Sequence, residues 1–209
     1  MVDCVVASNK AEGGYADSGG GIHNAGTLRI SDSEISDNVS NGGSGLANIG
    51  VAILDHVLIS GNNGGQSCNR GAGIRNAGHL TVTNSLITEN EACFGGAGIT
   101  HDSGTAFLAG VDFVANHARP GGVIGVAIDN FAVMTVTQSA VISNTGSGYD
   151  PTVIASQSGS LTLENCTVSG NDGGIQGRYI AITNCTIAGN RGYGLWGGTG
   201  PIANSIVVD

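Results

Sequence analysis

A few side chains in this sequence carry the functional groups of acid–base catalysis. Abstracting a proton beside a carboxylate needs a cation to neutralise the charge, a base to take the proton and an acid to protonate the leaving oxygen. Guanidinium, imidazole, phenol and carboxyl groups suit these roles when a fold brings them together. The candidate catalytic residues are Arg75, His101, Asp129, Tyr149 and Asp150.

Other polar and aromatic residues are suited to holding a substrate. A Trp ring offers a flat apolar face with a polar edge, which suits stacking on a sugar ring. Hydroxyl, amide and charged groups supply directional hydrogen bonds. The candidate binding residues are His23, Arg75, Thr100, Asp129, Gln176 and Trp196.

Charge and composition exclude several other classes of function. The formal net charge is −9, which repels a phosphate backbone, so we expect no nucleic-acid partner. No run of 18 apolar residues is present, so we expect no membrane span, and the N-terminal residues show no signal peptide. The five Cys form no CxxC pairs and the five His fall at unrelated positions, so we expect no metal and no cofactor.

A repeat explains both the composition and the placement of these candidates. An apolar residue stands three places before an Asn eight times, as in Ile87 and Asn90, with 19 to 29 residues between successive Asn. Between these points apolar and polar residues alternate, as in Leu80 to Thr83, which is typical of strands. The Asn residues of the repeat are Asn9, Asn38, Asn62, Asn90, Asn116, Asn144, Asn171 and Asn190.

Units of this kind bury their apolar face only by stacking on one another. The repeat therefore predicts an all-β fold, a single-stranded, right-handed parallel β-helix of about eight coils with three short strands per coil. Its high glycine content, 37 of 209 residues, suits tight corners and a narrow interior. We expect one domain over residues 1–209, a fragment of a longer solenoid, with an Asn ladder along its axis.

The segment before each alternating run predicts three further rows. We expect an inward row, an outward row that borders a lateral groove, and a second polar row two places after the inward residue. The inward row is Ile22, Leu46, Ile74, Ile99, Ile128, Ala155, Ile175 and Leu195. The outward row is His23, Ala47, Arg75, Thr100, Asp129, Ser156, Gln176 and Trp196. The second polar row is Asn24, Asn48, Asn76, His101, Asn130 and Gln157.

Cysteines and aromatic residues add two narrower expectations. Cys68 and Cys93 each stand six residues before an inward Ile, in loops of adjacent coils, so they are the candidate disulfide, which implies an oxidising compartment. Tyr193 and Trp196 either stack on a sugar ring or close the end of the interior.

The repeat resembles known β-helix families. Gly-Gly-Gly-Ile at 19–22, Gly-Ala-Gly-Ile at 71–74 and 96–99, and Phe-Val-Ala-Asn at 113–116 are similar to repeats of bacterial polymorphic outer membrane proteins. More widely, the chain resembles the pectin-lyase-like superfamily, whose members include adhesins, lyases, hydrolases and epimerases. Gly148 to Pro151 is similar to part of an alginate-epimerase signature, although Thr152 stands where that signature has His.

Three functions remain open at this point. The first is a non-catalytic, extracellular or cell-surface module that contacts a polysaccharide or host glycan. The second is a lyase or epimerase on uronate polymers, for which calcium could bridge the acidic protein and its anionic substrate. The third is a structural spacer that self-associates through uncapped coil ends.

Overall fold

Alternating residues place every second side chain of a strand in the interior. In strand β7 (His79–Thr88), Leu80 and Val82 are fully buried while Thr81 and Thr83 lie on the outer face. The computed structural model describes residues 1–11, 19–65, 70–119, 125–146, 152–198 and 200–208. Within these ranges every regular element is a strand.

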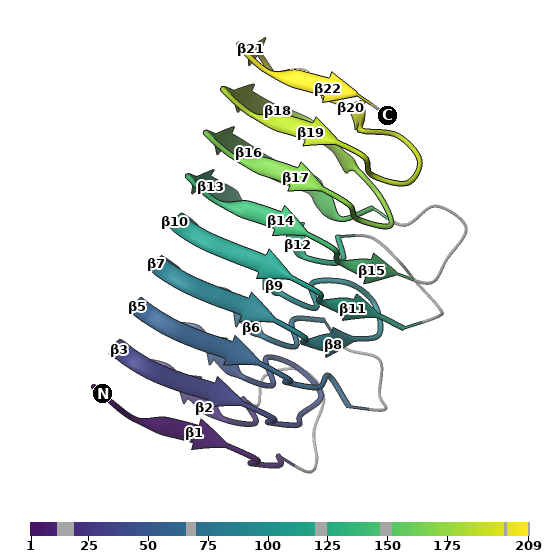
Figure 1. Cartoon of the computed structure of the whole chain (residues 1–209). Coiled ribbons are helices and arrows are strands. Elements are labelled where there is room, and N and C mark those ends of the chain that lie inside the picture. Colours follow the sequence, from purple (N-terminus) through teal and green to yellow (C-terminus); the bar gives the residue numbers. More distant parts are fainter. Residues whose placement is uncertain (12–18, 66–69, 120–124, 147–151, 199, 209) are drawn as a thin grey trace.

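The strands stack in parallel into a solenoid (Figure 1). The nearer strands in Figure 1 run from left to right and the chain rises from the N-terminus, so the solenoid is right-handed. The first and last turns are incomplete, and the stack holds about six turns where about eight coils were expected.

Two long rows of strands form most of the wall. Up to β10 one strand bends through both rows, whereas later coils divide the same path between two strands. The bent strands are β3 (Thr27–Ser36), β5 (Val51–Ser60), β7 and β10 (Thr105–Val114), whereas β1 (Val5–Ala7) is shorter and pairs only with the C-terminal part of β3. The later ones are β13 (Val133–Thr137), β14 (Ala140–Ile142), β16 (Ile154–Glu164), β17 (Thr167–Ser169), β18 (Ile175–Thr183), β19 (Thr186–Ala188), β21 (Ile202–Ala203) and β22 (Ile206–Val208).

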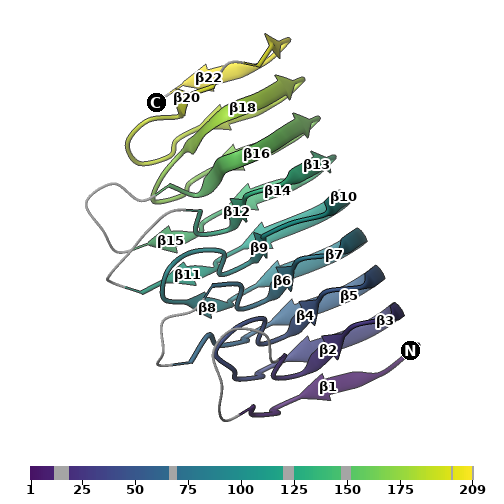
Figure 2. The same ribbon diagram turned by 180° about the vertical axis from the view of Figure 1, so that it is seen from behind.

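A row of short strands forms the remaining wall, seen from behind in Figure 2. The N-terminal parts of β16 and β18 continue this row. The other short strands are β2 (Ile22–Asn24), β4 (Leu46–Asn48), β6 (Ile74–Asn76), β9 (Ile99–His101), β12 (Ile128–Asn130) and β20 (Leu195–Gly197). A small separate sheet comprises β8 (Glu91–Ala92), β11 (His117–Ala118) and β15 (Thr145–Gly146).

The Asn ladder explains the spacing of the repeat. The side-chain oxygen of Asn90 accepts hydrogen bonds from the backbone N and the Nδ2 of Asn62, at 3.0 and 2.9 Å. Asn90 Nδ2 in turn donates to the carbonyl of Ile59, which stands three places before Asn62. The apolar residue therefore fills the interior and also supplies the acceptor for the Asn of the next coil.

Two bends with positive φ turn each coil. The first is the outer bend at which Asn84 and Asn184 have φ of 48° and 53°. The second is the residue just before the ladder Asn, such as Glu89 with φ of 55°. The ladder Asn itself keeps negative φ, so its role is hydrogen bonding and not tolerance of the left-handed region.

Length variation is confined to one corner of the coil. From the inward residue of a short strand to the ladder Asn, the chain always takes 15 to 17 residues, as from Ile99 to Asn116 or from Ile175 to Asn190. From the ladder Asn to the next inward residue it takes between 4 (Asn171 to Ile175) and 13 (Asn9 to Ile22). The hydrogen-bonded wall is thus constant and the corner after the ladder varies.

The two glycines of the Gly-Ala-Gly-Ile motif allow close backbone packing just before a short strand. Gly71 has φ of +74°, and a Cβ there would lie 2.8 Å from the Cβ of Arg75, four residues later. A Cβ on Gly73 would lie 2.5 Å from the carbonyl oxygen of Gly98 on the next coil. The first glycine therefore permits the turn, and the third permits the coils to stack.

Gly71→Ala is expected to destabilise the protein by about 1–3 kcal/mol, because it combines left-handed backbone strain with a clash at Arg75. Gly26→Ala is the matched control, since nothing lies within 4 Å of a Cβ there and its φ is not positive. It should change stability by less than about 1 kcal/mol. Chemical denaturation of both variants tests this, and equal losses would contradict it.

Candidate functional site

The short-strand row brings three of the candidate residues onto neighbouring coils. Arg75 on β6 pairs in register with Thr100 on β9, which pairs with Asp129 on β12. The row continues from Asp129 through Ala155, Gln176 and Trp196. His23 lies at the opposite end of the row on β2, where it is exposed.

One coil differs from the expected register by a single residue. Ile154 pairs with the inward Ile128, Ala155 with the outward Asp129, and Ser156 with Asn130 of the second polar row. The expected assignments of Ala155 inward, Ser156 outward and Gln157 to the polar row were therefore wrong. Val153, Ile154 and Ala155 are all apolar, so alternation alone could not fix which of them faces inward.

The middle of the outward row is covered, which contradicts an open groove along its whole length. Thr100 and Asp129 are both 0 % exposed. Gly96 and Gly125, four residues before them, have φ of +60° and +68° and lie directly against their side chains. A glycine four places before the outward residue is the sequence signal for this covering turn, as it is for Ala47 and Arg75.

His101 is part of a second ladder and is not an exposed catalytic group. Its Nδ1 accepts from Asn76 Nδ2 at 2.9 Å, and its Nε2 lies 3.1 Å from the carbonyl oxygen of Val133, which can only accept. Asn48 makes the equivalent contacts, since its Oδ1 accepts from Asn24 Nδ2 and its Nδ2 donates to the His79 carbonyl. Burial lowers the pKa of His101, so the imidazole is neutral and replaces an Asn amide.

Arg75 forms an ion pair with a neighbouring carboxylate. Its Nε donates to Asp102 Oδ2 at 2.7 Å, and both side chains are about three-quarters buried. The cleft beside it, lined by Ala47, Asn48, Ile49, Arg75 and Ala77, has a volume of only about 10 Å³. This is no larger than one water needs, so this cleft does not hold a sugar ring.

Asp129 is the carboxylate of this row, and its side chain is buried. Its Oδ1 accepts from Gln157 Nε2 at 2.7 Å, whereas its Oδ2 has no hydrogen-bond partner among the described residues. Arg70 Nε lies 3.8 Å from that oxygen and its guanidinium packs over the Phe131 ring. Burial raises the pKa of Asp129 to about 7, which the Gln157 hydrogen bond and Arg70 only partly offset.

An open hollow lies at the C-terminal end of the same row. Its volume is about 310 Å³, within the range of small-ligand sites. The residues lining this C-terminal hollow are Ala155, Ser156, Gln157, Gln176, Gly177, Arg178, Trp196 and Gly197. Ser156, Gly177 and Gly197 take the register positions that earlier coils fill with Asn or His, so the hollow forms where the second ladder ends.

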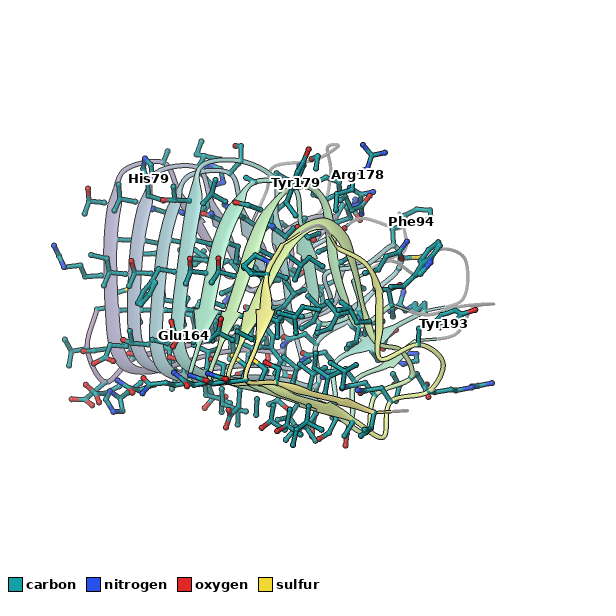
Figure 3. All side chains as sticks on the ribbon, turned by 90° about the horizontal axis from the view of Figure 1, so that it is seen from above. His79, Phe94, Glu164, Arg178, Tyr179 and Tyr193 are labelled. Carbon is teal, nitrogen blue, oxygen red and sulfur yellow. The ribbon has the colours of Figure 1, made fainter. Side chains whose placement is uncertain are left out.

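Aromatic rings flank this hollow. Trp196 is 56 % exposed and stacks with Tyr193, with ring centroids 6.5 Å apart and planes at 25°. Exposure on this scale shows that Trp196 does not close the interior. Arg178 and Tyr193 project outward from the last coils (Figure 3). Arg178 was not among the expected binding residues, although period-2 alternation from Gln176 places it on the outer face.

The remaining candidates are placed as follows. Tyr149 and Asp150 lie outside the described residues. Cys93 is disulfide-bonded, and because the expected partner Cys68 also lies outside the described residues, the pairing stays a prediction. No group of three His, Cys, Asp or Glu in the described chain could hold a metal ion.

Comparison with known proteins gives no family for the chain. Among the described residues there is also no helix long and apolar enough to cross a bilayer. No family model matches the sequence, and neither a curated protein nor a solved structure matches it.

Proposed function

We propose that this protein is a non-catalytic, extracellular or cell-surface β-helix module that contacts a polysaccharide or host glycan through the C-terminal hollow. The observation that carries the proposal is the exposed Trp196 beside Gln176 and Arg178 in a hollow of about 310 Å³. An exposed aromatic face with nearby amide and guanidinium donors is suited to a sugar ring and its hydroxyl groups. The right-handed stack and Asn ladder support membership of the pectin-lyase-like superfamily, which remains part of this proposal.

The chemistry of the middle coils favours binding over catalysis. Thr100 and Asp129 have no exposed surface, Arg75 is held by Asp102, and His101 is a ladder residue. A lyase or epimerase needs these groups to reach the reacting carbon. The polysaccharide-active enzyme and the self-associating spacer are therefore the alternatives, and the following experiments can detect either of them.

Trp196→Ala is expected to weaken glycan binding by roughly tenfold to a hundredfold, since an apolar ring surface of this size contributes about 1–3 kcal/mol when buried. Phe107→Ala is the matched control, because Phe107 is 45 % exposed on another wall of the solenoid. We would measure binding on a glycan array and then by calorimetry with pectate, alginate, heparin and hyaluronan oligosaccharides.

Three outcomes would contradict the proposal. Binding that survives Trp196→Ala places the contact elsewhere, and absence of binding across the array rejects glycan contact. A rise in ultraviolet absorbance from unsaturated uronates, with or without calcium, identifies a lyase instead. Separately, size-exclusion chromatography at rising protein concentration, without glycan, detects the self-association expected of a structural spacer.

A further inference from the structure

The buried carboxylate of Asp129 is connected to the C-terminal hollow by one side chain. Gln157 lines that hollow, and its Nε2 donates to Asp129 Oδ1 at 2.7 Å. The chain places Gln157 there through an irregularity in β16, where Ser156 and Ser160 pair with Gly177 and Tyr179. Such bulges re-aim a side chain away from the regular register.

Few groups near Asp129 can form a hydrogen bond or an ion pair with its carboxylate. Its Oδ2 lies 3.8 Å from Nε of Arg70, which precedes β6 two coils earlier. Thr100 Oγ1 on the adjacent strand β9 likewise has no hydrogen-bond partner among the described residues. Asp102, after β9, adds a repulsive negative charge, although it is paired with Arg75 on β6. These groups leave the carboxyl free to change its protonation state near neutral pH.

We propose that protonation of Asp129 controls the orientation of the Gln157 amide and thereby the shape of the C-terminal hollow. The ionised carboxylate accepts only, so it holds Gln157 Nε2 in one orientation. The protonated carboxyl carries its own O–H donor, for which the Gln157 carbonyl and the Thr100 hydroxyl are the acceptors at hand. Arg70 also loses its attraction to Oδ2 in the protonated state.

The consequence for ligand binding rests on the proposed function. A fixed Gln157 pre-organises the wall of the hollow, so glycan affinity is expected to be about fivefold lower at pH 6 than at pH 8. By linkage, a bound glycan lowers the proton affinity of Asp129 to the same extent.

The primary test needs no glycan. We would follow the side-chain amide resonance of Gln157 by NMR from pH 5.5 to 8.5, assigning it as the signal missing from a Gln157→Ser variant. The resonance should shift with a midpoint near pH 7 in the native chain and stay constant in Asp129→Asn. Fluorescence of Trp196, the single Trp of the chain, should report the same transition.

An amide resonance that does not titrate, or that titrates equally in Asp129→Asn, overturns the inference. The exposed His residues are common to both proteins, so the comparison removes their contribution. With pectate, alginate, heparin and hyaluronan as probes, absence of binding at every pH rejects the proposed function while the NMR result still decides the inference. Binding that is independent of pH in the native chain rejects the control of affinity by Asp129.

Discussion

Replacing Asn90 with alanine is expected to lower the free energy of unfolding by about 3–5 kcal/mol. Asn90 is fully buried in the middle of the ladder. Its loss removes the acceptor of the Asn62 backbone N and one of the two acceptors of Asn62 Nδ2, which keeps the Ile35 carbonyl, and it removes the side-chain donor to the Ile59 carbonyl. Each buried unsatisfied group costs roughly 1–3 kcal/mol, and an alanine methyl restores none of these bonds.

Chemical denaturation followed by circular dichroism measures this loss. The matched control is Asn165→Gly, because Asn165 is an exposed outer-bend residue with φ of 54° that glycine adopts readily. That variant should change stability by less than about 0.5 kcal/mol. A loss below about 1 kcal/mol for Asn90→Ala would mean that the ladder amides are dispensable.

Asp129→Asn is expected to stabilise the protein more strongly as the pH rises. The pKa of Asp129 is raised to about 7, above the ordinary aspartate value of 3.8, so the folded state binds this proton more tightly than the unfolded state does. The contribution of Asp129 is therefore favourable below its unfolded pKa and is lost as the pH rises through about 7. Asparagine does not ionise, and its Nδ2 can donate to the unsatisfied Thr100 hydroxyl.

The expected signature is a difference between two pH profiles. The stability of Asp129→Asn relative to the native chain should increase by roughly 3 kcal/mol between pH 5 and pH 8. Every other titrating group is common to both proteins and cancels. Asp112→Asn is the control, since it makes the same substitution at an exposed position. Parallel profiles for Asp129→Asn would show that this carboxyl titrates normally.

The sequence was informative about the stack because the ladder and the interior use the same residues. Each apolar-x-x-Asn element must both fill the interior and bond to the next coil, so it repeats with little freedom. The fold class and the Asn ladder were therefore predictable. The register of Ile154 was not, because neighbouring apolar residues make both faces of the strand acceptable.

The candidate site was harder to predict for a different reason. Alternation shows that Thr100 and Asp129 point out of the interior, but it does not show what lies above them. Gly96 and Gly125 lead the chain over those side chains, and this depends on backbone conformation and not on hydrophobic pattern. For Trp196 the sequence left two roles open, stacking on a sugar ring or closing the end of the interior, and only its exposure in the structure excludes the second.

Because the wall is constant and the corner varies, such a protein can accept insertions in its sequence at that corner. Insertions between Asn62 and Ile74, or between Asn116 and Ile128, add chain in the corner after the ladder Asn, whose length already varies from coil to coil. Lengthening a loop costs little free energy, since closure entropy grows only slowly with loop length. New recognition segments can therefore be acquired at one corner, coil by coil, without a matching change elsewhere in the scaffold.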